Sequence, residues 1–189
     1  MHQRLVAAAC AAVITGAQAD GGNYAIDPTH TFVTFEISHF GTSTSRVRFD
    51  KKEGTVNFDR AARGGRVEIV INIASVNSGV APFDGQLRGK DLFNVAEHPT
   101  AKFVGDKFGF SGGQVTEVAG TLTLMGRTHP VTLKARHFNC YQNPLFRREV
   151  CGGDFETVIQ RSQWGLTYGL PAIAPDDVRL LVQVEAVKQ

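Results

Sequence analysis

Residues 178–186 read Val-Arg-Leu-Leu-Val-Gln-Val-Glu-Ala and alternate almost strictly between apolar and polar side chains. The even positions are apolar, whereas Arg179, Gln183 and Glu185 stand at odd positions. Since successive side chains of a β-strand point to opposite faces, a period of two predicts a strand with one buried and one solvated face. The stretch therefore favours an antiparallel sheet, in which one face packs on a core and the other meets water.

The same alternation recurs along most of the chain. It is clear in residues 31–39, 55–59, 66–73, 120–124 and 131–136, and weaker in residues 99–110 and 152–161. With the last segment these make about eight strands, and glycine-rich stretches between them are typical of turns. Long strands favour a closed barrel over a sandwich of short strands. We therefore expect an all-β, eight-stranded antiparallel barrel, whose interior is wide enough to be filled by side chains or to hold one small ligand.

Residues 82–93 break this pattern. Their apolar side chains Phe83, Leu87 and Leu92 fall at roughly helical spacing, although Gly85 and Gly89 weaken a helix. The segment predicts a short helical lid between strands.

The composition excludes several classes of protein. A hydrophobic fraction of 42% is too high for a disordered chain, and no apolar run is long enough to span a bilayer. A formal net charge of +2 argues against a nucleic-acid partner. The 13 Phe against 3 Tyr and 1 Trp supply aromatic area that makes no hydrogen bond. That area lines either an ordinary core or a cavity.

The first 19 residues are typical of a secretory signal peptide. Arg4 precedes an apolar stretch of residues 5–15, and Ala17-Gln18-Ala19 forms a small-x-small cleavage site before Asp20. A retained membrane anchor is the alternative, for which the stretch is too short. We expect residues 1–19 to be removed and residues 20–189 to form a single domain.

Cys140 and Cys151 are the two cysteines beyond the expected cleavage site. An even number of cysteines in an exported protein favours a disulfide. A redox or metal-binding pair is the alternative, but such pairs usually have closer spacing or further ligands. We therefore predict a structural bridge across the loop of residues 140–151.

The sequence contains few candidates for chemistry. Nucleophile-elbow, zinc-protease and phosphate-loop motifs are absent, and the histidines are dispersed, so we predict neither a catalytic nor a metal site. His39 continues the apolar face of its strand. Arg88 and Arg161 could each present a guanidinium to a ligand head group, with a surface ion pair as the alternative.

Four motifs, in order, resemble the YceI-like family of polyisoprenoid-binding or lipid-binding proteins. They are Tyr24-Ala-Ile-Asp-Pro-Thr-His-Thr31 with His39-Phe-Gly41, Ile73–Gly79 with Gln86–Val95, Gly120–Leu133, and Arg161-Ser-Gln-Trp-Gly-Leu166. The resemblance runs from Tyr24 to Val187. Two features depart from the family pattern: Gln86 stands where many members have a histidine, and Gln163-Trp164 replaces an Asp-Phe-like pair.

The resemblance implies a lipocalin-like barrel whose apolar lumen holds a long-chain polyisoprenoid, an isoprenoid quinone-like lipid or another amphiphile, for transport or storage in the periplasm. No cofactor other than this lipid is expected, and the protein is expected not to be an enzyme. The expected lining consists of the inward strand positions Phe35, Ile37, Phe58, Ile69, Ile71, Phe103, Leu122, Leu124, Leu133, Leu180 and Val182. Phe83, Leu87, Leu92 and Phe93 would form the lid, with His39 and Arg88 as polar contacts.

Two other functions stay open at this point. A filled barrel would act as an interaction module for a membrane or redox partner. An enzyme acting on a lumenal lipid would need His39 beside a carboxylate. A transient membrane or membrane-protein partner is compatible with either binding role, and the oligomeric state, a homodimer included, is not determined by the sequence.

Overall fold

The fold is described by a computed structural model over residues 21–145 and 147–189. The expected signal peptide, residues 1–19, and its cleavage site lie outside the described residues. Among the described residues, no helix has the length and apolar character needed to cross a bilayer.

Strands make up most of the described chain, with one short α-helix and two 3-10 turns between them. The elements are β1 (Gly22–Ile26), β2 (Phe32–His39), β3 (Ser43–Phe49), β4 (Lys52–Asp59), β5 (Gly64–Asn72), η1 (Ile73–Ser75), β6 (Val76–Asn77), α1 (Ala81–Arg88), β7 (Thr100–Ser111), β8 (Gln114–Leu124), β9 (Arg127–Asn143), β10 (Arg148–Gln160), η2 (Arg161–Trp164) and β11 (Asp177–Lys188).

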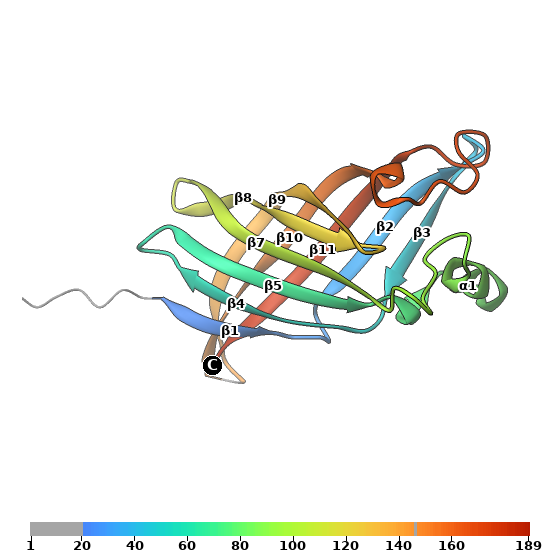
Figure 1. Ribbon diagram of the computed structural model, residues 1–189. Coiled ribbons are helices and arrows are strands. Elements are labelled where there is room, and N and C mark those ends of the chain that lie inside the picture. The colour runs from blue at the N-terminus through green and yellow to red at the C-terminus, as the bar shows by residue number, and fades with distance from the viewer. Residues whose placement is uncertain (1–20, 146) are drawn as a thin grey trace, which may run out of the picture.

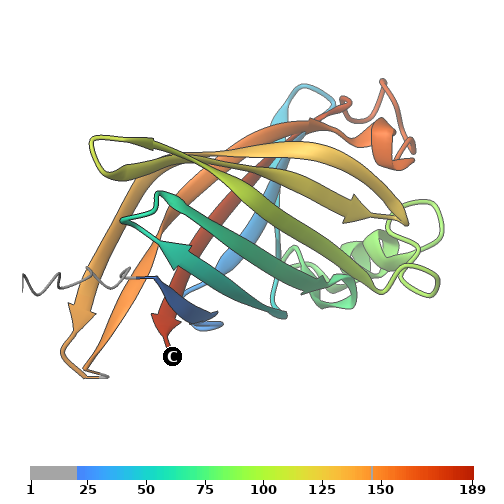
Figure 2. The same cartoon turned by 60° about the vertical axis from the view of Figure 1, so that its left-hand side comes forward.

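Eight of these strands close into an antiparallel barrel (Figure 1). The order is β1-β4-β5-β7-β8-β9-β10-β11, and β11 pairs with β1 to complete the ring. The prediction of an eight-stranded antiparallel barrel with a short helix is therefore confirmed. Seen from a second side, the long strands cross the barrel obliquely and α1 lies at one end (Figure 2).

Two lines of the barrel wall are each built from two successive strands, β1 with β2 and β4 with β3, and the chain changes neighbours at the break between them. The last residues of β11 pair with β1, whereas its residues 179–183 pair with β2, so β2 continues the line of β1. In the same way β3 pairs with β2 and β4 pairs with β1. Beyond the break β3 pairs with the short β6 instead of β5. The chain between β5 and β7 therefore partly covers this end of the barrel with η1, β6 and α1.

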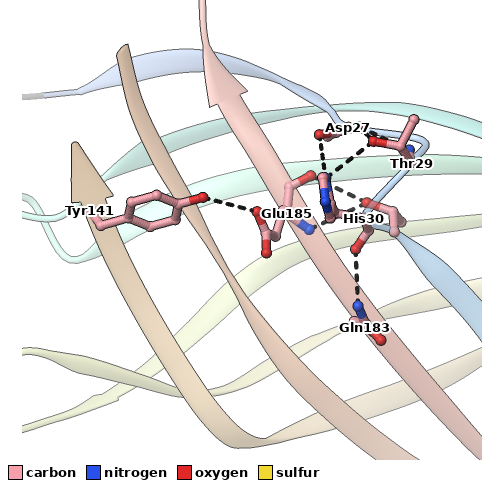
Figure 3. A network of polar contacts seen from close by, with 7 residues as sticks. Asp27, Thr29, His30, Tyr141, Gln183 and Glu185 are labelled. Atoms are coloured by element: carbon pink, nitrogen blue, oxygen red, sulfur yellow. Dashed lines mark hydrogen bonds and ion pairs between the residues drawn. The ribbon is translucent and has the colours of Figure 1, made fainter. Parts of the chain in front are cut away.

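A polar network holds the break between β1 and β2 (Figure 3). The Asp27 carboxylate accepts hydrogen bonds from the Thr29 backbone N–H at 2.8 Å and from the Thr29 hydroxyl, and it contacts His30 Nδ1 at 2.8 Å. The Thr31 hydroxyl and the Asp27 N–H both donate to the Glu185 carbonyl of β11. Since Pro28 has no N–H to give to a ladder, the chain turns here and resumes pairing at β2.

This network predicts a stability maximum at mildly acidic pH. Burial alone would raise the pKa of Asp27, but hydrogen bonds from His30 and Thr29 lower that pKa to about 2. The hydrogen bond to Asp27 raises the pKa of His30 above its ordinary 6.5. The Asp27 contribution is therefore lost as the pH falls from 3.8 toward 2. The His30 contribution is lost as the pH rises through its raised pKa.

We expect Asp27→Asn to reduce the free energy of unfolding by about 1 kcal/mol at pH 5 and by less at pH 3 and pH 9. Asparagine keeps an oxygen for the Thr29 N–H, so the comparison isolates the charge. Urea titrations across this pH range measure the difference. A variant whose deficit is the same at all three pH values would contradict the assignment.

Cys140 of β9 and Cys151 of β10 lie directly opposite each other and form a disulfide, with Cα atoms 4.0 Å apart. The predicted pairing agrees with the structure, but residues 140–151 are the end of a β-hairpin, not a loop. Because β9 and β10 are already paired as neighbouring strands of one hairpin, we expect the bridge to contribute about 2 kcal/mol, the lower part of the usual range. Unfolding of Cys140→Ser/Cys151→Ser against the oxidised wild type measures this, and an unfolded double variant would contradict it.

Candidate functional site

A cavity of about 620 Å³ occupies the α1 end of the barrel and is called the main cavity below. Its walls come from strands β2, β3, β5, β7, β8, β10 and β11, from η1 and η2, from the loop of residues 166–174 and from the α1 segment, defined here as residues 81–95. Its volume falls within the roughly 300–1,000 Å³ typical of ligand sites. The lumen at this end is therefore hollow.

Most of the predicted lining meets in this cavity. Eleven of the residues expected from the sequence lie around it: Phe35, Ile37, His39, Ile71, Phe83, Leu87, Leu92, Phe93, Leu122, Leu124 and Leu180. The rings of Phe35, Phe49 and Phe93 contact one another, with centroids 5.7–6.0 Å apart. Such contacts fix a wall of the cavity, because edge-to-face aromatic pairs have a preferred geometry.

The opposite half of the lumen is nearly filled. Five other expected residues, Phe58, Ile69, Phe103, Leu133 and Val182, surround a distal cavity of only about 70 Å³. Here the Phe58 ring packs against Phe108, Phe110 and Phe138, with centroids 5.6–6.2 Å apart. These five residues therefore surround the distal cavity but belong mainly to a packed core.

The α1 segment presents its apolar side chains to the main cavity. The helix itself ends at Arg88, with Gly89 as its C-cap, so the predicted helical spacing does not extend to Leu92. Leu92 and Phe93 reach the cavity from the following coil, in which the Phe93 N–H donates to the Leu87 carbonyl at 3.0 Å. At the helix start the Asp84 carboxylate accepts from the Ser78 N–H and hydroxyl at 2.7 and 2.6 Å. These bonds hold the lid in place.

Arg88 lies away from both cavities. Its guanidinium donates to the carbonyls of Ala74 and Val76, each at 2.9 Å. It therefore ties α1 to η1 and β6. The sequence suggested a head-group contact or a surface ion pair for this residue, but Arg88 lines neither of these cavities.

Arg161 is buried beside the main cavity, with 5% of its surface exposed. The sequence suggested a head-group contact or a surface ion pair, but this guanidinium is occupied by the loop of residues 166–175. It donates to four backbone carbonyls, those of Leu166, Tyr168, Ala174 and Pro175, at 2.8–3.2 Å. Burial lowers the pKa of Arg161 from its ordinary value, while Asp176 opposes that change. The side chain thus shapes one wall of the site.

The polar side chains around the main cavity are few. Ser38, His39, Ser45, Gln86 and Asp91 contribute to its lining. His39 is exposed at the end of β2, and its ring contacts Phe40 with centroids 4.7 Å apart. In the described part of the chain, no hydrogen bond or ion pair joins His39 to a carboxylate. The arrangement suits a mostly apolar ligand with a small polar end.

A second, more polar hollow of about 770 Å³ lies at the other end of the barrel, between Arg60, Arg148 and Lys188 among others. Its one glutamate, Glu149, accepts a hydrogen bond from Tyr24 and lies 3.8 Å from both Arg60 and Lys188. Polar walls of this kind offer an apolar chain little burial, so the main cavity is the candidate site. Across residues 21–145 and 147–189, no group of three or more His, Cys, Asp or Glu is placed to hold a metal ion.

Residues 24–186 match the sequence profile of the family described as "YceI-like domain". The chain belongs to the YceI-like family. A UPF0312 protein of Azotobacter vinelandii is 33% identical over 195 residues, which span the whole of both chains. A UPF0312 protein of Shewanella denitrificans is 35% identical over 176 residues and covers 90% of each chain.

Solved structures of YceI-like proteins share this barrel. Burkholderia cenocepacia BcnA superposes with a TM-score of 0.70 at 25% identity, covering 87% of this chain and 99% of BcnA. A Saccharophagus degradans domain described as polyisoprenoid-binding has a TM-score of 0.65 at 19% identity and covers 88% of this chain and 98% of its own. At this identity, the similarity to the Saccharophagus degradans domain shows a shared fold.

Proposed function

We propose that this YceI-like protein binds one long-chain isoprenoid or isoprenoid quinone-like lipid in the main cavity, for transport or storage in the periplasm. The observation that carries the proposal is the large apolar hollow at the α1 end of a barrel whose other half is packed. Lipid binding as the general role is supported by family membership and by the polyisoprenoid-binding domain of Saccharophagus degradans, which has the same fold.

The lining accounts for such a ligand in physical terms. Each CH₂ group transferred from water contributes about 0.8 kcal/mol before ordering costs, so a long tail is held without a charged anchor. Phe35, Leu122 and Leu124 offer that tail an apolar wall. His39 and Gln86 also line the main cavity and are partly open to solvent. They would contact a neutral head group of the ligand, such as an alcohol or a quinone.

We infer binding rather than catalysis, because among the residues that the structure describes no base in the polar lining is hydrogen-bonded to a second group that would orient it. His39 contacts an aromatic ring, and the Arg161 guanidinium is bonded to backbone carbonyls. A hydrogen-bonded partner is a common means by which an enzyme activates a nucleophile or a general base.

Solvent extraction of the protein purified from its native host, followed by mass spectrometry, tests the proposal. We expect about one long-tailed, neutral or weakly polar lipid per chain. If the extract is empty and the protein takes up neither a prenol nor a quinone from solution, the proposal is wrong.

A further inference from the structure

Three uncharged tips surround the mouth of the main cavity. The β2–β3 hairpin has no Asp, Glu, Lys or Arg over residues 37–45, nor does the lead into α1 over residues 78–83, nor the loop of residues 166–175. Phe40 and Tyr168 line the cavity, yet 61% and 53% of their surfaces are exposed. The cavity therefore reaches solvent between two exposed aromatic side chains.

These tips lie together at one end of the barrel (Figure 1). The Phe40 N–H of the hairpin donates to the Ile173 carbonyl of the loop at 2.8 Å, which joins two of the tips. The third tip carries Val80, 56% exposed, at the start of α1, and Phe83 of that helix lines the same cavity. The apolar rim is thus continuous with the apolar interior.

Three carboxylates next to the tips each have a partner. Glu36 pairs with Arg46 at 2.7 Å and with Arg179 at 3.2 Å. Asp84 accepts hydrogen bonds from Ser78, and Asp176 accepts from the Ser162 N–H and hydroxyl at 2.8 and 2.7 Å. An uncharged surface of this kind can approach an apolar medium without burying an unpaired charge.

We propose that these three tips dock on the surface of a zwitterionic phospholipid bilayer, so that the ligand passes between membrane and cavity without crossing water. This inference rests on the proposed function. Exposed Phe and Tyr are suited to the membrane interface, where an aromatic ring meets both acyl chains and polar groups. The tips carry no Lys or Arg, and the cavity lining includes the Asp91 carboxylate, so an anionic surface is disfavoured.

Flotation of the purified protein with phosphatidylcholine vesicles tests the docking. Val80→Glu/Ala172→Glu adds charges to two tips at exposed residues outside the cavity lining. We expect this variant to lose at least about tenfold in vesicle binding, because apolar area is lost and a charge must be desolvated. Leu145→Glu is the matched control: Leu145 is 85% exposed, in the β9–β10 turn at the other end of the barrel, and binding should change by less than about twofold.

Filling of the cavity is measured in parallel with a prenol delivered from cyclodextrin, by the shift in melting temperature. We expect the double variant to fill as the wild type does. Vesicle binding unaffected by Val80→Glu/Ala172→Glu, or lost in Leu145→Glu, would overturn the docking. So would wild-type protein that fills from cyclodextrin but never floats, or that self-associates through these tips instead. Flotation with normal sensitivity to the variants, but no filling, would refute the proposed ligand and leave the docking standing.

Discussion

Replacing Ala101 by Trp is expected to abolish uptake of a long-chain lipid while leaving the barrel folded. Ala101 lies on β7 opposite Ile71 of β5, is 4% exposed, and both residues line the main cavity. An indole added there extends into space that the ligand would occupy. We expect affinity for a prenol or quinone to fall at least about a hundredfold, a loss of about 2.7 kcal/mol.

The same substitution one residue along provides the control. Lys102 follows on β7, points outward and pairs with Glu68 at 2.6 Å. Lys102→Trp should therefore bind lipid like the wild type, because its indole lies outside the cavity. The fold should also stay stable, because exposed ion pairs contribute little to the free energy of unfolding. In a packed interior an inserted ring would destabilise the fold by about 1–3 kcal/mol, whereas a hollow accepts it. Undiminished uptake by a folded Ala101→Trp variant would exclude the main cavity as the site.

Replacing Arg161 by Met is expected to be the most destabilising of the substitutions considered. Methionine keeps the apolar stem and removes all the donors, so the four carbonyls of residues 166–175 lose their shared partner. A buried polar group left unpaired costs about 1–3 kcal/mol. Because the loop can partly rehydrate, we expect the free energy of unfolding in urea to fall by about 3–5 kcal/mol in total.

Arg179→Met is the matched control for that experiment. Arg179 bonds to Glu156 and Glu36 on the outside of the barrel, where 43% of its side chain is exposed. Its loss should leave the free energy of unfolding nearly unchanged, because exposed ion pairs contribute little to stability. The free energy of unfolding of Arg161→Lys should lie between those of Arg161→Met and Arg179→Met, since an ammonium group reaches fewer of the four carbonyls. If Arg161→Met is no less stable than Arg179→Met, the four bonds do not hold the loop.

Alternation was sufficient to predict the barrel because most of its strands have one face in the lumen and one in water. It missed β1, a barrel strand of only five residues, and β3, in which Val47 and Phe49 are the apolar inward residues of an otherwise polar stretch. The strand expected over residues 131–136 also begins four residues earlier than predicted, at Arg127, directly after a turn. Met125 and Gly126 complete that turn alone, each with a positive φ, so Pro130 lies inside a strand.

The hollow could not be predicted from the pattern of residues. Inward positions look alike in the sequence whether their side chains meet or leave space, and Phe35 and Phe58 differ in this respect although both alternate with polar neighbours. The open half of the lumen lies beyond the break between β3 and β4, on the side where α1 is inserted. Both features depend on strand pairing between distant segments of the chain. The role of Arg161 was missed for the same reason, because its partners are backbone carbonyls.

The location of the bound tail tests the central claim most directly. The purified protein would be loaded with a long-chain alcohol that carries a diazirine near the end of its tail, irradiated, digested and mapped by mass spectrometry. We predict cross-links on the main cavity, to β2, the α1 segment and β8, and their loss in Ala101→Trp. Cross-links confined to the polar hollow around Arg60 and Arg148, or found equally in Ala101→Trp, would contradict the account.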